Sequence, residues 1–421
     1  LVKPLGPRRQ VVVARHGQAT ARLRLVVGRN DVAARRVVLA RQIAPESFPF
    51  VLASSGHRQP TCPPTAIGCE AGDHQRDISL LVAADQVVRR ELPGHRALEE
   101  VFMQLEGGTY CVLAPSGMAA INIAFLGILK SGDHVLVCDG VYGPVRNLDR
   151  ALLKGLGINV TYFSAQDDLD ALITPATKLI YVESPGSLLF EMLDLPAMAA
   201  IAKQRGVLLA TDNTWGSGYI YRPLALGADI SVVAGTKYVA GHSDVMLGAV
   251  IAKDESVAAR LHSAQYAMGN SISADDAWLA LRGVKTMAVR MPQHAINAMK
   301  VCEFFDAQAY VAKIFHPAWH KDAGYALWQR DCTGSNGMLS VELKCSPDAA
   351  KAYVDALTLY GIGFSWGGYE SLVQWVDPAT LASHSYWKHS PNALLRFHIG
   401  LEDIDDLIND LKQAANYLPR T

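Results

Sequence analysis

The stretch ISVVAGTKYV, residues 230–239, holds an apolar run, then small and hydroxyl residues, and then Lys237. A second stretch, LLATDNTW at residues 208–215, ends its apolar run at Asp212, twenty-five residues before that lysine. Short apolar runs that alternate with helical patterns are typical of buried parallel strands. Such sheets bind ligands beyond the carboxyl ends of their strands. The two stretches therefore predict a ligand site with an acid and a lysine at neighbouring strand ends.

Lys237 and Asp212 together are suited to one cofactor, pyridoxal phosphate (PLP). A lysine can hold PLP as a Schiff base, while a carboxylate keeps the pyridine nitrogen protonated. A lysine after a strand is more often a solvated surface charge, and an acid there is more often a helix N-cap. The small residues before Lys237 favour the cofactor, because they let a bulky ligand approach the backbone. A partly desolvated lysine also loses its proton readily and can act as nucleophile and base.

Other residues could complete a PLP site. The sequence PSGM at residues 115–118 predicts a helix start, where the N–H groups of Gly117 and Met118 could hold a phosphate. The hydroxyl of Thr236 could reach the same phosphate. Tyr142 follows a predicted strand and could stack on a flat ring. The alternatives are an ordinary capped helix and an ordinary turn tyrosine.

Arg396 lies in the predicted strand LLRFHI, residues 394–399. Strand alternation places Leu395, Phe397 and Ile399 on one face and Arg396 on the other. A planar guanidinium on that face could bind a substrate carboxylate through two hydrogen bonds, or it could pair with an acid of the protein.

Composition excludes several classes of protein. The chain has 421 residues, of which 50% are hydrophobic and 19% charged, so a large core is expected. Its net charge of −1 gives no reason to expect binding to nucleic acid or to an anionic membrane. No apolar run is long enough to span a membrane, and no histidine spacing indicates a metal site. Seven scattered cysteines and the lack of a leader pattern predict a cytoplasmic protein.

The chain divides into three predicted segments. Residues 1–96 carry fourteen Arg and one Lys against seven acids and lack helical periodicity. They could be a targeting or nucleic-acid-binding arm, a poorly structured extension, or a stretch translated out of frame. From residue 97 the pattern is regular α/β and predicts a mostly parallel sheet with helices on both faces. We expect a cofactor domain over 97–283 and a smaller α/β domain over 284–421, which carries Arg396.

The boundaries of several elements follow from the pattern. Strands are predicted at 111–113, 134–138, 159–163, 178–182, 207–211 and 230–233. Helices are predicted at 97–105, 118–129, 145–156, 169–172, 195–205 and 403–417, and a long helical region at about 275–307.

The motifs resemble those of one known family. They are LEGG at 105–108, PSGMAA at 115–120, ESPGS at 183–187, DNTW at 212–215, TKYVAGHSD at 236–244, SWGGYESL at 365–372 and RFHIGLED at 396–403. Over residues 97–419 the chain resembles the Cys/Met-metabolism family of PLP-dependent enzymes, which has fold type I. ESPGS and SWGGYES are most similar to the bacterial cystathionine β-lyases of that family.

The resemblance implies a role for each candidate residue. It makes Lys237 the catalytic Schiff-base lysine and Tyr142 the catalytic ring-stacking residue. Asp212 would pair with the pyridine nitrogen. The phosphate would be held by Gly117, Met118 and Thr236, and the substrate α-carboxylate by Arg396, Ser365 and Trp366.

The resemblance also implies a reaction and an assembly. The expected reaction is α,β-elimination of L-cystathionine, a small sulfur amino acid, within transsulfuration and methionine biosynthesis. The expected assembly is a homotetramer, a dimer of dimers. The family has a Tyr-Gly-Arg segment that reaches the phosphate of a neighbouring subunit. An ungapped count places Val87 at its tyrosine and Arg89 at its arginine. Alternatives are a cystathionine or methionine γ-lyase, and a PLP-binding protein whose catalysis is impaired by the unusual segment 1–96.

Overall fold

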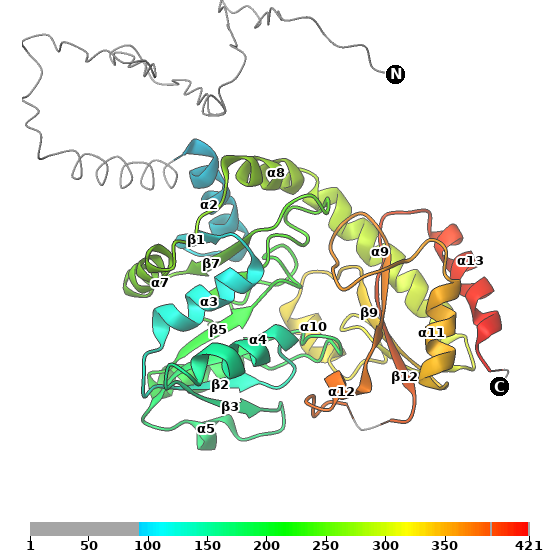
Figure 1. Ribbon diagram of the computed structural model, residues 1–421, viewed down its shortest axis with the longest axis horizontal. Helices are drawn as coiled ribbons and strands as arrows, with labels where there is room; N and C mark the ends of the chain where they lie inside the picture. The colour runs from blue at the N-terminus through cyan, green and yellow to red at the C-terminus, as the bar shows by residue number, and fades with distance from the viewer. Residues whose placement is uncertain (1–91, 388–389, 420–421) are drawn as a thin grey trace, which may run out of the picture. The chain divides into compact units, whose positions relative to one another are not determined.

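The computed structural model describes residues 92–387 and 390–419 (Figure 1). Almost all of the Arg-rich segment 1–96, including Val87 and Arg89, lies outside these residues. The described part contains two sheets with flanking helices, so the predicted α/β class is confirmed. Both sheets belong to one compact unit, and the boundary between residues 283 and 284 stays a prediction.

The first sheet has seven strands in the order β1-β7-β6-β5-β4-β2-β3. The strands are β1 (Tyr110–Ala114), β2 (His134–Cys138), β3 (Asn159–Phe163), β4 (Thr177–Glu183), β5 (Leu208–Asp212), β6 (Ile230–Val233) and β7 (Gly248–Ala252). β7 is antiparallel to both of its neighbours, and the remaining neighbours pair in parallel. The strands β2, β6 and β7 are buried along their whole length, as expected for a sheet covered on both faces.

Six helices belong to this sheet, and local signals explain where most of them begin. They are α2 (Pro93–Glu106), α3 (Gly117–Ile128), α4 (Gly143–Leu148), α5 (Leu169–Leu172), α6 (Leu195–Arg205) and α7 (Glu255–Ala267). The side chains of Ser116, Asp194 and Asp254 cap α3, α6 and α7. Proline occupies the first turn of α2, which lets that helix begin four residues earlier than predicted.

The helix predicted over 145–156 changes type after residue 148 and ends three residues early, at residue 153. After α4 the chain forms a π-helix, η1 (Asp149–Leu153), and then a turn. The N–H of Lys154 donates to the carbonyl of Asp149, five residues back, which widens the helix. The hydroxyl of Tyr162 on β3 also donates to the Asp149 carboxylate.

Two helices connect the sheets where one helical region was predicted. α8 (Ala274–Val284) starts with a capping box between Ser273 and Asp276. α9 (Met287–Asp306) follows after two residues and leads toward the second sheet, where it contacts β8, β9 and α13 (Figure 1). Among the described residues, no helix has the length and apolar character needed to cross a membrane.

The second sheet has five strands in the order β10-β11-β12-β9-β8. The strands are β8 (Val311–Phe315), β9 (Met338–Leu343), β10 (Gly361–Ile362), β11 (Leu372–Val376) and β12 (Ala393–His398). Only β10 and β11 pair in parallel within this sheet, as the structure describes it. Its helices are α10 (Tyr325–Asp331), α11 (Pro347–Ala356), α12 (Pro378–Leu381), α13 (Ile404–Ala414) and the 3-10 turn η2 (Ala415–Tyr417).

β12 shows the predicted alternation. Leu395 and Phe397 belong to the apolar core of the second sheet. Leu394 belongs instead to the core of the first sheet. Because alternate side chains share a face, Arg396 and His398 lie with Leu394 on the face that meets the first sheet.

Candidate active site

Polar side chains gather at one edge of the first sheet. Asp212 is the last residue of β5, and Glu183, the last residue of β4, is its register partner. Tyr142 follows β2, the N-terminus of α3 follows β1, and Lys237 lies four residues beyond β6. The carboxyl ends of these five strands lie at the same edge, because β7 alone runs the other way. The fold therefore brings together residues from distant parts of the sequence.

Lys237 is partly buried, and it contacts the loop that precedes β11. Its Nζ donates a hydrogen bond to Ser365 Oγ at 2.9 Å and lies 5.3 Å from the centroid of the Trp366 ring. Burial and the charge of Arg396 lower the pKa of Lys237 to about 8, although Asp212 acts in the opposite direction. A substantial neutral fraction near neutral pH suits a nucleophile and base.

Asp212 is buried and bonded to neutral groups. Its Oδ1 accepts the N–H of Thr214 at 2.9 Å, and the Tyr181 hydroxyl lies 3.5 Å from Oδ2. Burial raises the pKa of Asp212, which the bonds from Thr214 partly oppose. A protonated pyridine nitrogen would supply the positive charge that favours this carboxylate, so Asp212 fits the predicted cofactor.

The N-terminus of α3 fits a phosphate. Ser116 caps the helix by accepting the N–H of Ala119, and the first turn contains no acid. A Cβ at Gly117 would lie 2.7 Å from the Ala234 Cβ, so glycine is needed for the helix to approach the Lys237 loop this closely. The N–H groups of Gly117 and Met118 lie in the first turn, where a helix favours anions.

The hydroxyl of Thr236, which was predicted to reach the phosphate, bonds the protein backbone. It donates to the Leu247 carbonyl at 3.0 Å and accepts the Leu247 N–H at 2.9 Å. The one hydroxyl proton is therefore already used, and a bond to phosphate would require it to rotate. In this arrangement Thr236 fixes the start of the Lys237 loop to the residue before β7.

Tyr142 is held by a residue to which the sequence pattern gave no role. Tyr142 is 44% exposed, while its backbone N–H donates to Glu183 Oε2 at 2.6 Å. Burial and the neighbouring Asp212 hold the pKa of Glu183 well above its usual range. An acid that ends a strand beside Asp212 was the available signal, and it is the same signal that identified Asp212.

Arg396 contacts the same loop as Lys237, and its charge contributes to the lowered pKa of that lysine. It is 9% exposed, and its Nη2 donates to the Phe364 carbonyl at 2.8 Å. Its buried Nε has no partner among the described residues. Burial lowers the pKa of Arg396 to about 10, so the side chain remains charged and has a free donor for a carboxylate.

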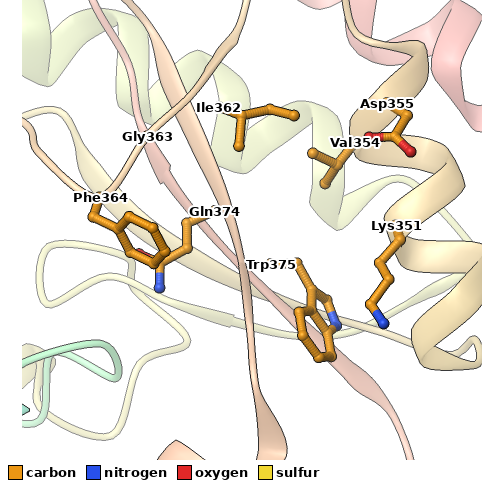
Figure 2. A pocket seen from close by; sticks show the side chains of 8 residues that line it. All are labelled: Lys351, Val354, Asp355, Ile362, Gly363, Phe364, Gln374 and Trp375. Carbon is orange, nitrogen blue, oxygen red and sulfur yellow. The ribbon is translucent and has the colours of Figure 1, made fainter.

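A pocket lies on the second sheet, between α11 and β10–β11 (Figure 2). It is lined by Lys351, Val354, Asp355, Ile362, Gly363, Phe364, Gln374 and Trp375. Lys351 Nζ lies 4.3 Å from the centroid of the Trp375 ring. Phe364 connects the pocket to the polar side chains at the strand ends of the first sheet, because its carbonyl accepts a hydrogen bond from Arg396. The pocket contains neither Lys237 nor Asp212, so we place the candidate active site at the strand ends.

The family model for Cys/Met metabolism PLP-dependent enzymes matches residues 83–416. The match covers most of the chain, and the chain belongs to this family. PLP is its cofactor, as the lysine and acid at neighbouring strand ends predicted.

Relatives of known name are similar over nearly their whole length. The chain is 57% identical to the cystathionine β-lyase of Bordetella avium over 373 residues, which are 89% of this chain and 92% of the relative. It is 36% identical to the cystathionine β-lyase MetC of Escherichia coli over 77% of this chain and 84% of the relative. The first match is longer than residues 97–421, so similarity begins upstream of residue 97, earlier than the motifs indicated.

Solved structures confirm fold type I. The structure of metB from Corynebacterium glutamicum matches with a TM-score of 0.74 at 35% identity, over 78% of this chain and 86% of that one. A cystathionine gamma synthase from Xanthomonas oryzae pv. oryzae, in complex with cystathionine, also matches with a TM-score of 0.74. Its identity is 32%, over 78% of this chain and 87% of that one.

Proposed function

We propose that this protein is a carbon–sulfur lyase that cleaves L-cystathionine by α,β-elimination. One water is consumed, and the products are homocysteine, pyruvate and ammonia. The observation that carries the proposal is the position of Lys237, four residues beyond β6 at the same edge of the sheet as Asp212, with its Nζ bonded to Ser365; burial also lowers its pKa to about 8. The choice of substrate is supported by the 57% identity to a cystathionine β-lyase. The homocysteine formed would serve methionine biosynthesis.

The cofactor would be held from three sides. The N–H groups of Gly117 and Met118 would bind the phosphate, Asp212 would face the pyridine nitrogen, and the ring of Tyr142 would stack on the cofactor ring. When bound, PLP supplies an electron sink for the charge left at the substrate Cα. Glu183 supports this arrangement, because it fixes the backbone of Tyr142.

The substrate would be placed by the second sheet. Arg396, with a free Nε, would bind the α-carboxylate, helped by Ser365 and Trp366. Lys237 would take the Cα proton and then deliver a proton to the departing sulfur. A single group can perform both steps efficiently when its pKa lies near the working pH.

The alternative is γ-elimination, as in a cystathionine or methionine γ-lyase. Its support is the structural match to a cystathionine gamma-lyase from Lactobacillus plantarum, at 31% identity. Product analysis separates the two reactions. Purified protein with PLP and L-cystathionine should release pyruvate and homocysteine. Release of 2-oxobutyrate and cysteine would establish the γ-lyase, and bound PLP without turnover would establish a cofactor-binding protein with impaired catalysis.

Assembly and location are also proposals. Exposed apolar side chains on α8 and α9, Trp278, Val289 and Ile296, support association of the chain, for which we propose a homotetramer. Arg89 would then reach a neighbouring phosphate. Residues 97–283 and 284–421 would act as the cofactor and substrate domains. The five described cysteines are free thiols, which supports a reducing compartment such as the cytoplasm.

A further inference from the structure

The loop 364–371, between β10 and β11, lies directly against the backbone of Lys237. Its residue Gly367 has φ +84°, and a Cβ there would lie 2.9 Å from both the Cα and the carbonyl carbon of Lys237. Two residues earlier, Ser365 Oγ accepts the lysine Nζ. Figure 2 shows where the loop begins, at Phe364 beside Gln374 of β11. Small changes in this loop would therefore move Ser365 and Trp366 relative to the reacting lysine.

His398 bonds this loop at two points. The N–H of Gly367 donates to its Nε2 at 3.1 Å, and its Nδ1 lies 3.0 Å from the carbonyl oxygen of Glu370. An amide N–H can only donate, and a carbonyl oxygen can only accept. Nε2 must therefore carry a lone pair and Nδ1 a proton, so the bonds require one neutral tautomer of the ring.

The surroundings of His398 favour this neutral form. The ring is 1% exposed, and its centroid lies 5.1 Å from that of His294 and 5.9 Å from that of Tyr238. Burial, with the neighbouring His294 and the charges of Arg396 and Lys237, holds the pKa of His398 well below its usual range, although its bond to the Glu370 carbonyl opposes the shift.

Other anchors hold the ends of the loop. Arg396 donates to the Phe364 carbonyl, and Ser243 donates to the Glu370 carboxylate at 2.7 and 2.9 Å. At the far end, Glu402 accepts two bonds from Ser371. In the middle of the loop, His398 bonds Gly367, the glycine that follows Trp366, and the Leu401 N–H donates to the Tyr369 carbonyl at 2.8 Å.

We propose that His398 is a positioning residue that seats the loop 364–371 on Lys237 and so holds Ser365 and Trp366 in place for the substrate. The inference deepens the proposed function and rests on it. Both ring nitrogens of His398 bond backbone groups of the loop, so the residue is given no direct role toward the lysine Nζ or the substrate carboxylate. It acts through the Gly367 and Glu370 backbone.

Three variants separate the two bonds. A glutamine amide oxygen can replace Nε2 as acceptor, an asparagine amide N–H can replace Nδ1 as donor, and leucine can do neither. With L-cystathionine, we expect kcat/KM to fall less than about 3-fold in His398→Gln, about 10-fold in His398→Asn and about 10- to 100-fold in His398→Leu, mainly through KM. His316→Gln is the matched control, because His316 is equally buried but accepts the N–H of Ala318 instead.

Hydrogen exchange of the peptide 364–371 gives a readout that does not depend on turnover. The Gly367 amide should stay protected in the wild type and in His398→Gln, and should exchange faster in His398→Asn. Equal exchange and equal KM in the Gln and Asn variants would overturn the proposal. So would a KM change in His316→Gln as large as that in His398→Asn. If wild-type protein does not cleave cystathionine, the proposed function fails, and the exchange pattern still decides whether His398 seats the loop.

Discussion

The two sheets present their functional side chains in different ways. In the seven-stranded sheet, Asp212 and Lys237 lie at or beyond the ends of parallel strands. In the five-stranded sheet, Arg396 lies inside β12, and His398, the last residue of that strand, shares its face. The difference follows from burial. A parallel sheet covered on both faces can offer a ligand only its edge, whereas a mixed sheet with helices on one face can offer side chains from its other face.

The buried charges of the two regions differ as well. Around the first sheet they are mostly acids with raised pKa values, among them Glu106, Glu183 and Asp212. Around the second sheet they include bases with lowered pKa values, Arg396 and His398, together with one acid, Asp322, whose pKa is raised by burial. Burial disfavours the charged form of each of these side chains. A ligand with a cationic ring nitrogen facing Asp212 and an anionic carboxylate facing Arg396 would offset that cost.

The largest expected effect belongs to the first sheet. Lys237→Ala should lower kcat on L-cystathionine by about 10³-fold or more, because a general base and acid is removed. Borohydride reduction with peptide mapping should fix the cofactor to Lys237 in the wild type, and not in the variant. Lys253→Ala is the control, since Lys253 is a lysine outside the candidate site, whose Nζ donates to the Leu224 carbonyl. A variant at position 237 that keeps a tenth of the activity would refute the assignment.

A smaller loss of activity is expected when Arg396, on the second sheet, is replaced. Arg396→Ala should lower kcat/KM about 10- to 150-fold, because a charge-assisted hydrogen bond contributes about 1.5–3 kcal/mol. Arg396→Lys keeps the charge without the planar fork, and should recover part of the loss. PLP binding should remain. Arg290→Lys changes a similarly buried arginine, which donates to the Tyr238 and Gly283 carbonyls, and should leave KM nearly unchanged.

Much of the first sheet could be predicted from sequence. The predicted strands 134–138, 159–163 and 230–233 agree with the structure at both ends. β7, Gly248–Ala252, was not predicted. It is rich in Gly and Ala, which have low strand propensity, and its position is set by antiparallel pairing with β1 and β6. The π-helix η1 likewise depends on packing that no local pattern shows.

The site residues also divide into those that local sequence predicts and those that depend on contacts between distant segments. Asp212 and Lys237 could be predicted because strand ends are local features. The contact between Lys237 and Ser365 spans 128 positions, so only family resemblance indicated it. His398 could have been found, since alternation places it on the same face as Arg396. Its two backbone partners lie in a loop whose path the sequence does not reveal.

Cofactor incorporation should show how the second sheet acts on the first. Uncharged Lys237 is the form that reacts with PLP, and its pKa is about 8. The initial rate of PLP uptake by apoprotein should rise about 10-fold per pH unit below pH 8 and level off above it. Because Arg396 lowers this pKa, Arg396→Ala should move the midpoint to higher pH. Absorbance of the bound cofactor follows the reaction, and a midpoint near 10.5 in the wild type would contradict the lowered pKa.

The smallest effect concerns Glu191, a buried acid beside the first sheet. Both of its carboxylate oxygens are without a hydrogen-bond partner among the described residues, and burial raises its pKa to about 8. Folded protein therefore binds an extra proton between pH 4.5 and 8, so the stability from this group is complete below pH 4.5 and is lost as the pH rises through 8. Glutamine mimics the protonated acid and avoids that loss.

Glu191→Gln should accordingly leave the Tm unchanged at pH 5 and raise it by about 1 to 3 °C at pH 8.5. The histidines near the second sheet give the opposite slope. His294 and His316 are buried with pKa values lowered to about 4, so each costs stability as the pH falls from about 6.5 toward 4. His316→Gln should therefore reduce the loss of Tm between pH 6.5 and 5, whereas Glu303→Gln, an exposed change on α9, should alter neither slope. If Glu191→Gln lowers the Tm equally at both pH values, the Glu191 carboxylate has a hydrogen-bond partner in the folded protein. The raised pKa of this buried acid is then contradicted.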